Sequence, residues 1–140
     1  MAIVNMSTPK SKWEFMVAVF GRGKSSSYSI KSLNVLTQGL RFMSIVTEYT
    51  ITVTYKRIPV NVPDPAAFVL LKYLVSTKKR DPAKETKDLK TANELGQFMF
   101  NDPSKRQMIK LIFNSMYKKW QHTILHVMEE QSSPFFNFLQ

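Results

Sequence analysis

The sequence predicts an α+β fold, in which a small antiparallel or mixed sheet from the N-terminal half packs against a C-terminal portion of three helices. Two observations lead to this expectation. Segments rich in β-branched and aromatic residues occupy the first half, and the pair Asp-Pro occurs three times after residue 63. With 140 residues, 44% of them hydrophobic, the chain can bury one core. We expect a single domain over residues 1–140, with a strand-rich part at 1–62 and a helical part at 63–140.

Strand signals begin with residues 13–20, where aromatic and β-branched side chains are frequent, and glycine and serine follow in a turn at 21–32. A second strand is expected at 48–57, since threonines alternate there with apolar residues at the period of two that marks a half-buried strand. Residues 58–62 suggest a short third strand. Between the first two strands, leucines at loose helical spacing predict that 30–46 is helical in part.

Helix starts are expected at Asp64-Pro65, Asp81-Pro82 and Asp102-Pro103. An aspartate at the N-cap accepts hydrogen bonds from free N–H groups of the first turn, and proline next to it lacks an N–H that would have had no partner. The predicted helices run from 65 to about 77, from 82 to about 100 and from 103 to about 129.

The third predicted helix is expected to present one apolar stripe, because its hydrophobic residues follow the i, i+3, i+4, i+7 pattern. The stripe would consist of Met108, Leu111, Ile112, Ser115, Met116, Trp120, Ile124, Val127 and Met128. The phenylalanine-rich tail at 132–140 is expected to dock on the body of the protein or on a partner.

Composition excludes several classes of protein. The chain has no cysteine, which removes disulfide frameworks, thiolate zinc sites and cysteine nucleophiles. Its longest apolar runs are far shorter than the roughly 18 residues that suggest a membrane span. The start of the sequence does not resemble a signal peptide, so we expect a cytoplasmic protein without a membrane partner.

Charge points to polyanionic partners. Twenty Lys and Arg stand against ten Asp and Glu, which leaves a net charge of +10. Residues 72–90 hold seven of the basic and three of the acidic residues, so this segment is the first candidate for an anion site. Charge alone leaves nucleotides, nucleic acid and anionic lipid open as partners, and of these we expect nucleotides and nucleic acid, RNA included.

Two local motifs are weak. Residues 18–25 end in Gly-Lys-Ser like a phosphate loop, but Ala18 stands where that motif needs glycine and no apolar helix follows, so we expect a solvated basic turn. His122 and His126 are four residues apart on a predicted helix, with Glu129 and Glu130 close by. This is the minimum for a metal site, although ordinary histidines are much commoner.

Several spaced segments match a known family in order. They are Leu40-Arg-Phe-Met43, Ile58-Pro-Val-Asn-Val-Pro-Asp-Pro-Ala-Ala-Phe68, Leu71-Lys-Tyr-Leu-Val-Ser76, Lys79-Arg80 and Lys87-Asp-Leu89 followed by Ala92. Over residues 12–100 the chain resembles the C-terminal part of bacterial nucleotidyltransferase-like proteins of the DNA polymerase β superfamily. It departs from them at Leu71, where the family often has His, and at Thr91, where it often has Gln.

The resemblance implies specific site residues. Glu14, in Lys12-Trp-Glu-Phe-Met16, takes the place of the third family carboxylate and would be a catalytic residue and magnesium ligand. Lys72 would contact a phosphate, Arg80 and Lys87 would support it, and Asp88, the second catalytic position, would orient a lysine or cap the network. The family uses three carboxylates and two Mg²⁺ ions for nucleotidyl transfer. The paired Asp-x-Asp carboxylates do not occur in this sequence.

Three functional hypotheses therefore stay open. The first is a nucleotidyltransferase-like fragment that binds a nucleoside triphosphate or an acceptor and is inactive alone. The second is a non-enzymatic basic protein, of mobile-element or phage type, that binds nucleic acid or an acidic protein. The third is an oligomer, or a complex with a protein partner, in which another chain covers an open edge of the sheet.

Overall fold

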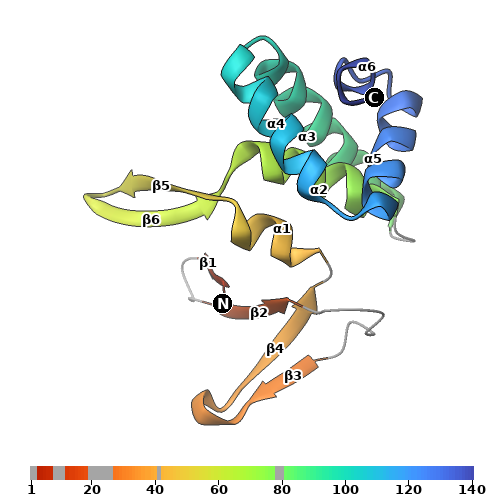
Figure 1. Cartoon of the computed structure of the whole chain (residues 1–140). Helices are drawn as coiled ribbons and strands as arrows, with labels where there is room; N and C mark the ends of the chain where they lie inside the picture. The colour runs from red at the N-terminus through yellow and green to blue at the C-terminus, as the bar shows by residue number, and fades with distance from the viewer. Residues whose placement is uncertain (1–2, 8–11, 19–26, 41, 78–80) are drawn as a thin grey trace. The chain divides into compact units, whose positions relative to one another are not determined.

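The computed structural model describes residues 3–7, 12–18, 27–40, 42–77 and 81–140. The chain divides into two compact units, Met1–Glu48 and Tyr49–Gln140, and each is described by itself (Figure 1). Strands and helices are both present in quantity, so the predicted α+β class is confirmed. The expectation of a single domain stays a prediction.

The first unit contains a mixed four-stranded sheet in the order β1-β2-β4-β3. Its strands are β1 (Ile3–Ser7), β2 (Lys12–Ala18), β3 (Ser27–Ile30) and β4 (Val35–Leu40). β2 runs parallel to β4, whereas the pairs β1–β2 and β3–β4 are antiparallel. A short helix, α1 (Met43–Glu48), ends the unit and buries Met43, Ile45 and Val46.

The prediction that residues 30–46 are helical in part is confirmed at the two ends of this range, in a short 3-10 turn and in α1, and is wrong at 35–40, which form β4. A single 3-10 turn, η1 (Lys31–Leu33), joins β3 to β4, and Ile30 pairs with Val35 across it. Asn34 ends the turn in a left-handed conformation with φ 49°, which asparagine tolerates better than most residues. Leu36 and Leu40 belong to β4 instead, since loosely spaced leucines fit a strand as well as a helix.

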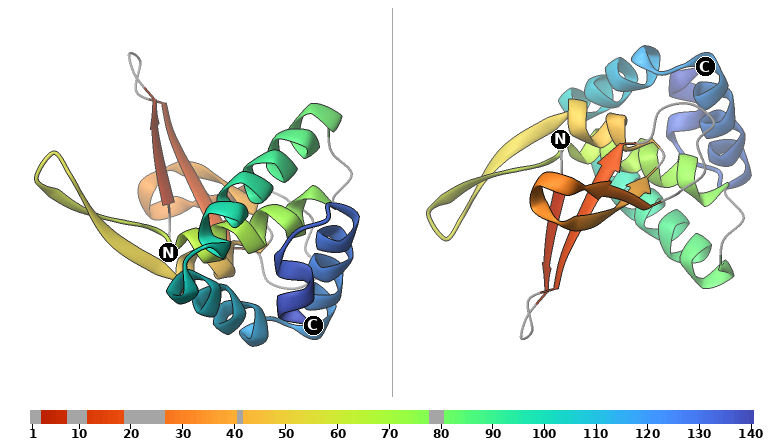
Figure 2. Two further views of the ribbon diagram at one scale, coloured as in Figure 1. Left: turned by 90° about the horizontal axis from the view of Figure 1, so that it is seen from above. Right: turned by 90° about the horizontal axis from the view of Figure 1, so that it is seen from below.

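A two-stranded antiparallel hairpin opens the second unit. It consists of β5 (Thr50–Tyr55) and β6 (Ile58–Pro63), which agree with the strands expected at 48–57 and 58–62. The expectation that the first of these strands is half-buried is wrong, because every residue of β5 is exposed. Nearly all of its residues are exposed, and Figures 1 and 2 show the hairpin projecting away from the helices of its own unit.

The Asp-Pro pairs start helices as predicted. α2 (Pro65–Ser76) begins where Asp64 Oδ1 accepts from the backbone N–H of Ala66 at 2.7 Å. α3 (Pro82–Phe100) begins at Asp81, whose carboxylate accepts from the N–H of Ala83 at 3.0 Å. Both helices end within a residue of the predicted position.

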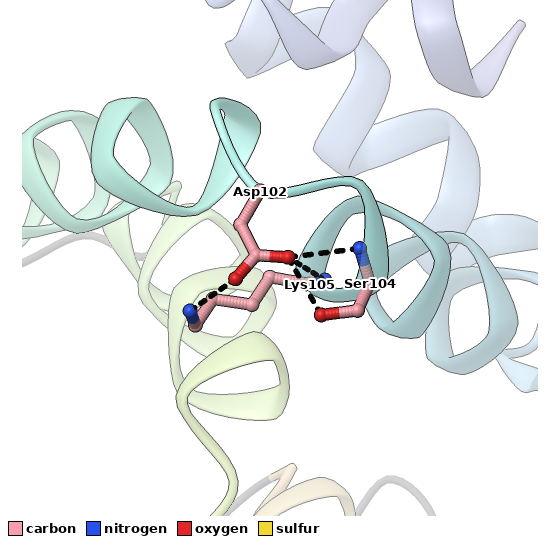
Figure 3. A network of polar contacts seen from close by, with 3 residues as sticks. All are labelled: Asp102, Ser104 and Lys105. Carbon is pink, nitrogen blue, oxygen red and sulfur yellow. Dashed lines mark hydrogen bonds and ion pairs between the residues drawn. The ribbon is translucent and has the colours of Figure 1, made fainter.

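Asp102 starts α4 (Pro103–Ser115) through several contacts at once (Figure 3). Its Oδ1 accepts from the N–H and the hydroxyl of Ser104 at 2.9 and 2.6 Å, and its Oδ2 pairs with the ammonium of Lys105. The bonds from Lys105 and Ser104 hold the pKa of Asp102 well below its ordinary value of 3.8.

The single helix expected at 103–129 is wrong, because the structure breaks it into α4 and α5 (Lys118–Glu130). Gln121 stabilises the break: its side-chain amide donates to the carbonyls of Phe113, Asn114 and Met116 at 2.9, 3.3 and 3.1 Å. These donors replace helical N–H groups at the end of α4.

The break also changes which face of α4 is buried. The structure buries Ile109, Ile112 and Phe113, whereas Met108 and Leu111 of the predicted stripe are 40% and 57% exposed. A single continuous helix turns one face toward the core along its whole length. Two helices joined by a bend can each turn a different face toward the same core.

α2 lies at the centre of the helical core and contacts α3, α4 and α5 (Figure 2). Its buried Tyr73 donates to Asn93 Oδ1 at 2.7 Å and also lies 3.2 Å from the Ser133 hydroxyl. Burial raises the pKa of the Tyr73 phenol.

The phenylalanine-rich tail docks on the body of the protein, which is one of the two outcomes expected for it. It forms α6 (Phe135–Leu139), and Phe135 is fully buried with its ring edge-on to Phe100 at 5.1 Å between centroids. The Phe135 ring packs against α3 near Gly96, where an added Cβ would lie 3.7 Å from the ring at an ordinary contact distance. Among the described residues, no helix is both long and apolar enough to cross a membrane.

Candidate functional site

An ion pair between α2 and α3 brings together two of the residues singled out from the sequence. Lys72 Nζ lies 2.6 Å from Asp88 Oδ1, with 24% and 9% of the two side chains exposed. This distance is typical of a strong charge-assisted hydrogen bond. The lysine is therefore held in place by a carboxylate that solvent hardly reaches.

Helix phase explains why Asp88 lies inside. The Asp81 N-cap sets the start of α3, and the residues that α3 buries are Asp88, Ala92, Gly96 and Met99. These positions recur every three or four residues and form one helix face. Asp88 is the charged member of that face, and a buried carboxylate needs a partner to offset its loss of hydration.

Lys72 occupies the flank of α2, next to the buried positions Leu70, Tyr73 and Leu74. Its ammonium also lies 5.1 Å from the ring centroid of Phe68, four residues earlier on the same helix. The aromatic face adds a cation–π contact to the ion pair. We did not predict the role of Phe68 from the sequence, although the i, i+4 spacing of an aromatic residue and a lysine is a signal that could have indicated it.

The neighbouring cations on α3 are exposed. Lys84, Lys87 and Lys90 all lie in solvent, and Lys90 is 3.8 Å from Glu94 in an exposed pair. Lys87 makes no ion pair with any described residue, so its charge is available to a ligand. Arg80, the remaining predicted phosphate contact, lies outside the described residues.

Glu14 belongs to the first unit. It lies in β2 opposite Asn5 of β1, as the backbone register shows. The described residues contain no group of three or more His, Asp or Glu side chains that could hold a metal ion. They do not by themselves form the two-magnesium site that the resemblance implies.

Two further motifs were singled out from the sequence. Residues 19–25 of the Gly-Lys-Ser segment lie outside the described part of the chain. His122 and His126 are both exposed on α5, and His126 Nε2 lies 3.7 Å from Glu130 Oε1 in an exposed i, i+4 contact.

The Lys72–Asp88 pair can bind an anion. An ammonium has three donors, and Asp88 Oδ1 accepts one of them, so a quarter-exposed lysine can still donate to a ligand oxygen. Because Asp88 and Phe68 already restrain Lys72, little side-chain freedom is lost when a ligand binds. The arrangement suits a phosphate oxygen approaching from the solvent side.

Comparison with known proteins gives the family. A model of a family described as nucleotidyltransferase matches residues 7–112, about three quarters of the chain. The chain belongs to this nucleotidyltransferase family. The matched region contains all five site residues expected from the sequence and ends within α4, so α5 and α6 lie outside it. No significant match was found among curated proteins or solved structures.

Membership in the nucleotidyltransferase family agrees with the resemblance drawn from the sequence. Within the matched region, the Lys72–Asp88 pair brings together a nearly buried carboxylate and a lysine whose side chain is restrained. It is therefore a candidate site for a phosphate group.

Proposed function

We propose that this protein provides the nucleotide- or acceptor-binding portion of a nucleotidyltransferase, with Lys72 as the phosphate contact. Family membership supports a nucleotide as substrate. The single observation that carries the proposal is the 2.6 Å contact between Lys72 and the nearly buried Asp88.

In this proposal the two residues have different roles. Lys72 donates to a phosphate oxygen of the nucleotide and offsets its negative charge. Asp88 is a positioning residue: it accepts from Lys72 and fixes the direction in which the ammonium points. Lys87 adds positive charge from the exposed side of α3, and Arg80 adds to it from the segment just before that helix.

Catalysis needs carboxylates that this sequence lacks. Its four aspartates are Asp64, Asp81, Asp88 and Asp102, and no two are separated by one residue. Glu14 is the residue that would hold Mg²⁺ here, and a single carboxylate binds that ion weakly. We therefore propose that another chain or segment supplies the Asp-x-Asp pair, and that the chain alone transfers little or no nucleotide.

Nucleotide binding tests the proposal directly. The purified protein is titrated with each nucleoside triphosphate and Mg²⁺, and Lys72→Ala is compared with wild type. A lost charge-assisted hydrogen bond corresponds to about 10- to 100-fold weaker binding. Lys90→Ala is the charge-matched control. It also removes one lysine charge from residues 72–90, but Lys90 is exposed and lies near Glu94.

Two further variants guard against misfolding. Asp88→Asn keeps the shape of the side chain but removes the charge that orients Lys72, so triphosphate affinity should fall less than in Lys72→Ala. The pair Lys72→Met with Asp88→Leu removes both charges together and is expected to fold. Triphosphate binding that survives in this double variant would refute the assignment.

A second candidate function is non-enzymatic binding of nucleic acid or of an acidic protein. The net charge of +10 and the exposed lysines of α3 favour it. It predicts steep salt dependence and no preference among nucleotides, because phosphate contacts carry no sequence information.

A further inference from the structure

The β5–β6 hairpin has one wholly apolar face. In the antiparallel register Ile51 faces Val62, Val53 faces Val60 and Tyr55 faces Ile58. Side chains of such pairs point to the same side of a sheet. The opposite side carries threonines, prolines and Asn61, and Thr52 donates to Asn61 there at 2.8 Å.

This apolar face is open to solvent. Tyr55 and Ile58, nearest the tip, are 63% and 62% exposed, and Ile51, Val53 and Val60 are 37% to 39% exposed. Figures 1 and 2 show why: the hairpin extends away from the helices of its unit. An exposed aromatic and aliphatic surface of this kind is typical of a binding site.

Two cations form the tip of the hairpin. Lys56 and Arg57 make the two-residue loop, and both have positive φ, 50° and 66°. Loops of this type favour Asn-Gly, because most side chains are strained in that conformation. The sequence instead places two basic residues here, which points to a function for their charges.

The tip is electrostatically suited to phosphate. Residues 49–63 contain no Asp or Glu. Neither Lys56 nor Arg57 makes an ion pair with any described residue, and Lys56 Nζ lies 5.4 Å from the centroid of the Tyr55 ring. An exposed ring beside free cations is the combination with which proteins bind unpaired bases and their phosphates.

We propose that the β5–β6 hairpin binds single-stranded nucleic acid. Lys56 and Arg57 contact phosphates, and Tyr55 stacks on an unpaired base with Ile58 beside it. A single strand fits better than a duplex, since base pairing and stacking hide the base faces that Tyr55 and Ile58 would cover. RNA and DNA strands should bind within a few-fold of each other, because neither contact reads the 2′-hydroxyl.

Binding of nucleic acid strands in the absence of nucleoside triphosphate tests this surface independently of the proposed transferase site. Fluorescence anisotropy measures the affinity for labelled strands of about 20 nucleotides at about 50 and 200 mM salt. The key variant is Lys56→Asn with Arg57→Gly. It removes both charges and supplies the residues that the loop geometry favours, so the hairpin keeps its fold.

The key variant should bind at least tenfold more weakly, with a salt slope of log K smaller by about 1.4, since each phosphate contact on a single strand contributes about 0.7. Tyr55→Leu should weaken binding about tenfold while leaving the salt slope unchanged. Lys118→Gln with Lys119→Gln is the matched control: it removes two adjacent exposed charges from α5 and should bind like wild type.

Several results would overturn the proposal. They are wild-type affinity in the key variant, an equal loss in the control, or duplex competing as well as single strand. Sedimentation experiments test the alternative that a second copy of the chain covers the apolar face. A wild-type dimer that Val53→Lys dissociates would assign the face to a second copy of the chain instead.

Discussion

Replacing both members of the Lys72–Asp88 pair should cost less stability than replacing either one. Lys72→Met leaves a carboxylate that is only 9% exposed without its ammonium. Asp88→Leu leaves the ammonium unpaired and also removes the further interactions in which Asp88 takes part. The double variant Lys72→Met with Asp88→Leu leaves neither charge behind.

The burial of the pair sets the magnitude. Breaking a fully buried ion pair costs about 3–5 kcal/mol, and the 24% exposure of Lys72 lets solvent offset part of this. We expect Lys72→Met to cost about 2–3 kcal/mol and Asp88→Leu at least as much. The double variant should cost less than either single variant, because two apolar side chains can pack where the pair was, but it still loses the further interactions of Asp88.

Urea unfolding followed by far-UV circular dichroism measures these differences. The long helices lie in the second unit, so the helical signal reports the unit that contains the pair. The double-mutant cycle should give a coupling energy of at least about 2 kcal/mol, because the double variant costs less than either single variant. A coupling below about 0.5 kcal/mol would refute the claim that the two charges depend on each other.

Three further predictions concern the second unit. Gly96→Ala should raise the Tm by a few degrees, since the new Cβ meets Phe135 at an ordinary 3.7 Å and alanine favours helix by about 1 kcal/mol; a lower Tm would contradict this. Gln121→Met should cost about 1–3 kcal/mol in chemical unfolding, because it removes the donors at the end of α4; an unchanged midpoint would show that other groups stabilise the break. Asp102 has a lowered pKa, so its carboxylate stabilises the fold above about pH 4, and this stabilisation is lost as the pH falls. In Asp102→Asn the free energy of unfolding should therefore depend less on pH in the acid range. A dependence as steep as in wild type would show that other groups cause the acid sensitivity.

Local signals predicted the helix starts correctly. An Asp-Pro pair acts through its own side chain and its missing N–H, so it needs no distant partner. The alternating pattern at 48–57 likewise identified β5, because threonine, isoleucine and valine are β-branched and are enriched in strands.

Two segments were misread because their local patterns were compatible with more than one structure. Leucines at loose spacing fitted a helix at 30–46, but pairing with β2 and β3 made residues 35–40 a strand. The stripe from 108 to 128 fitted one long helix, and no glycine or proline marks the bend. Gln121 stabilises that bend by reaching back to carbonyls five to eight residues earlier, a contact that exists only once the two helices have formed.

The candidate site divides in the same way. Resemblance indicated Lys72 and Asp88 from sequence, but sixteen residues separate them, and only the packing of α2 on α3 brings their charges to 2.6 Å. The sequence by itself indicated the family, and it determined the positive charge and the places where α2, α3 and α4 begin, because charge depends on composition and these helix starts depend on neighbouring residues. Tertiary structure decided which charges are buried, which lysine is restrained and which apolar face is left in solvent, because burial depends on segments that only folding brings together.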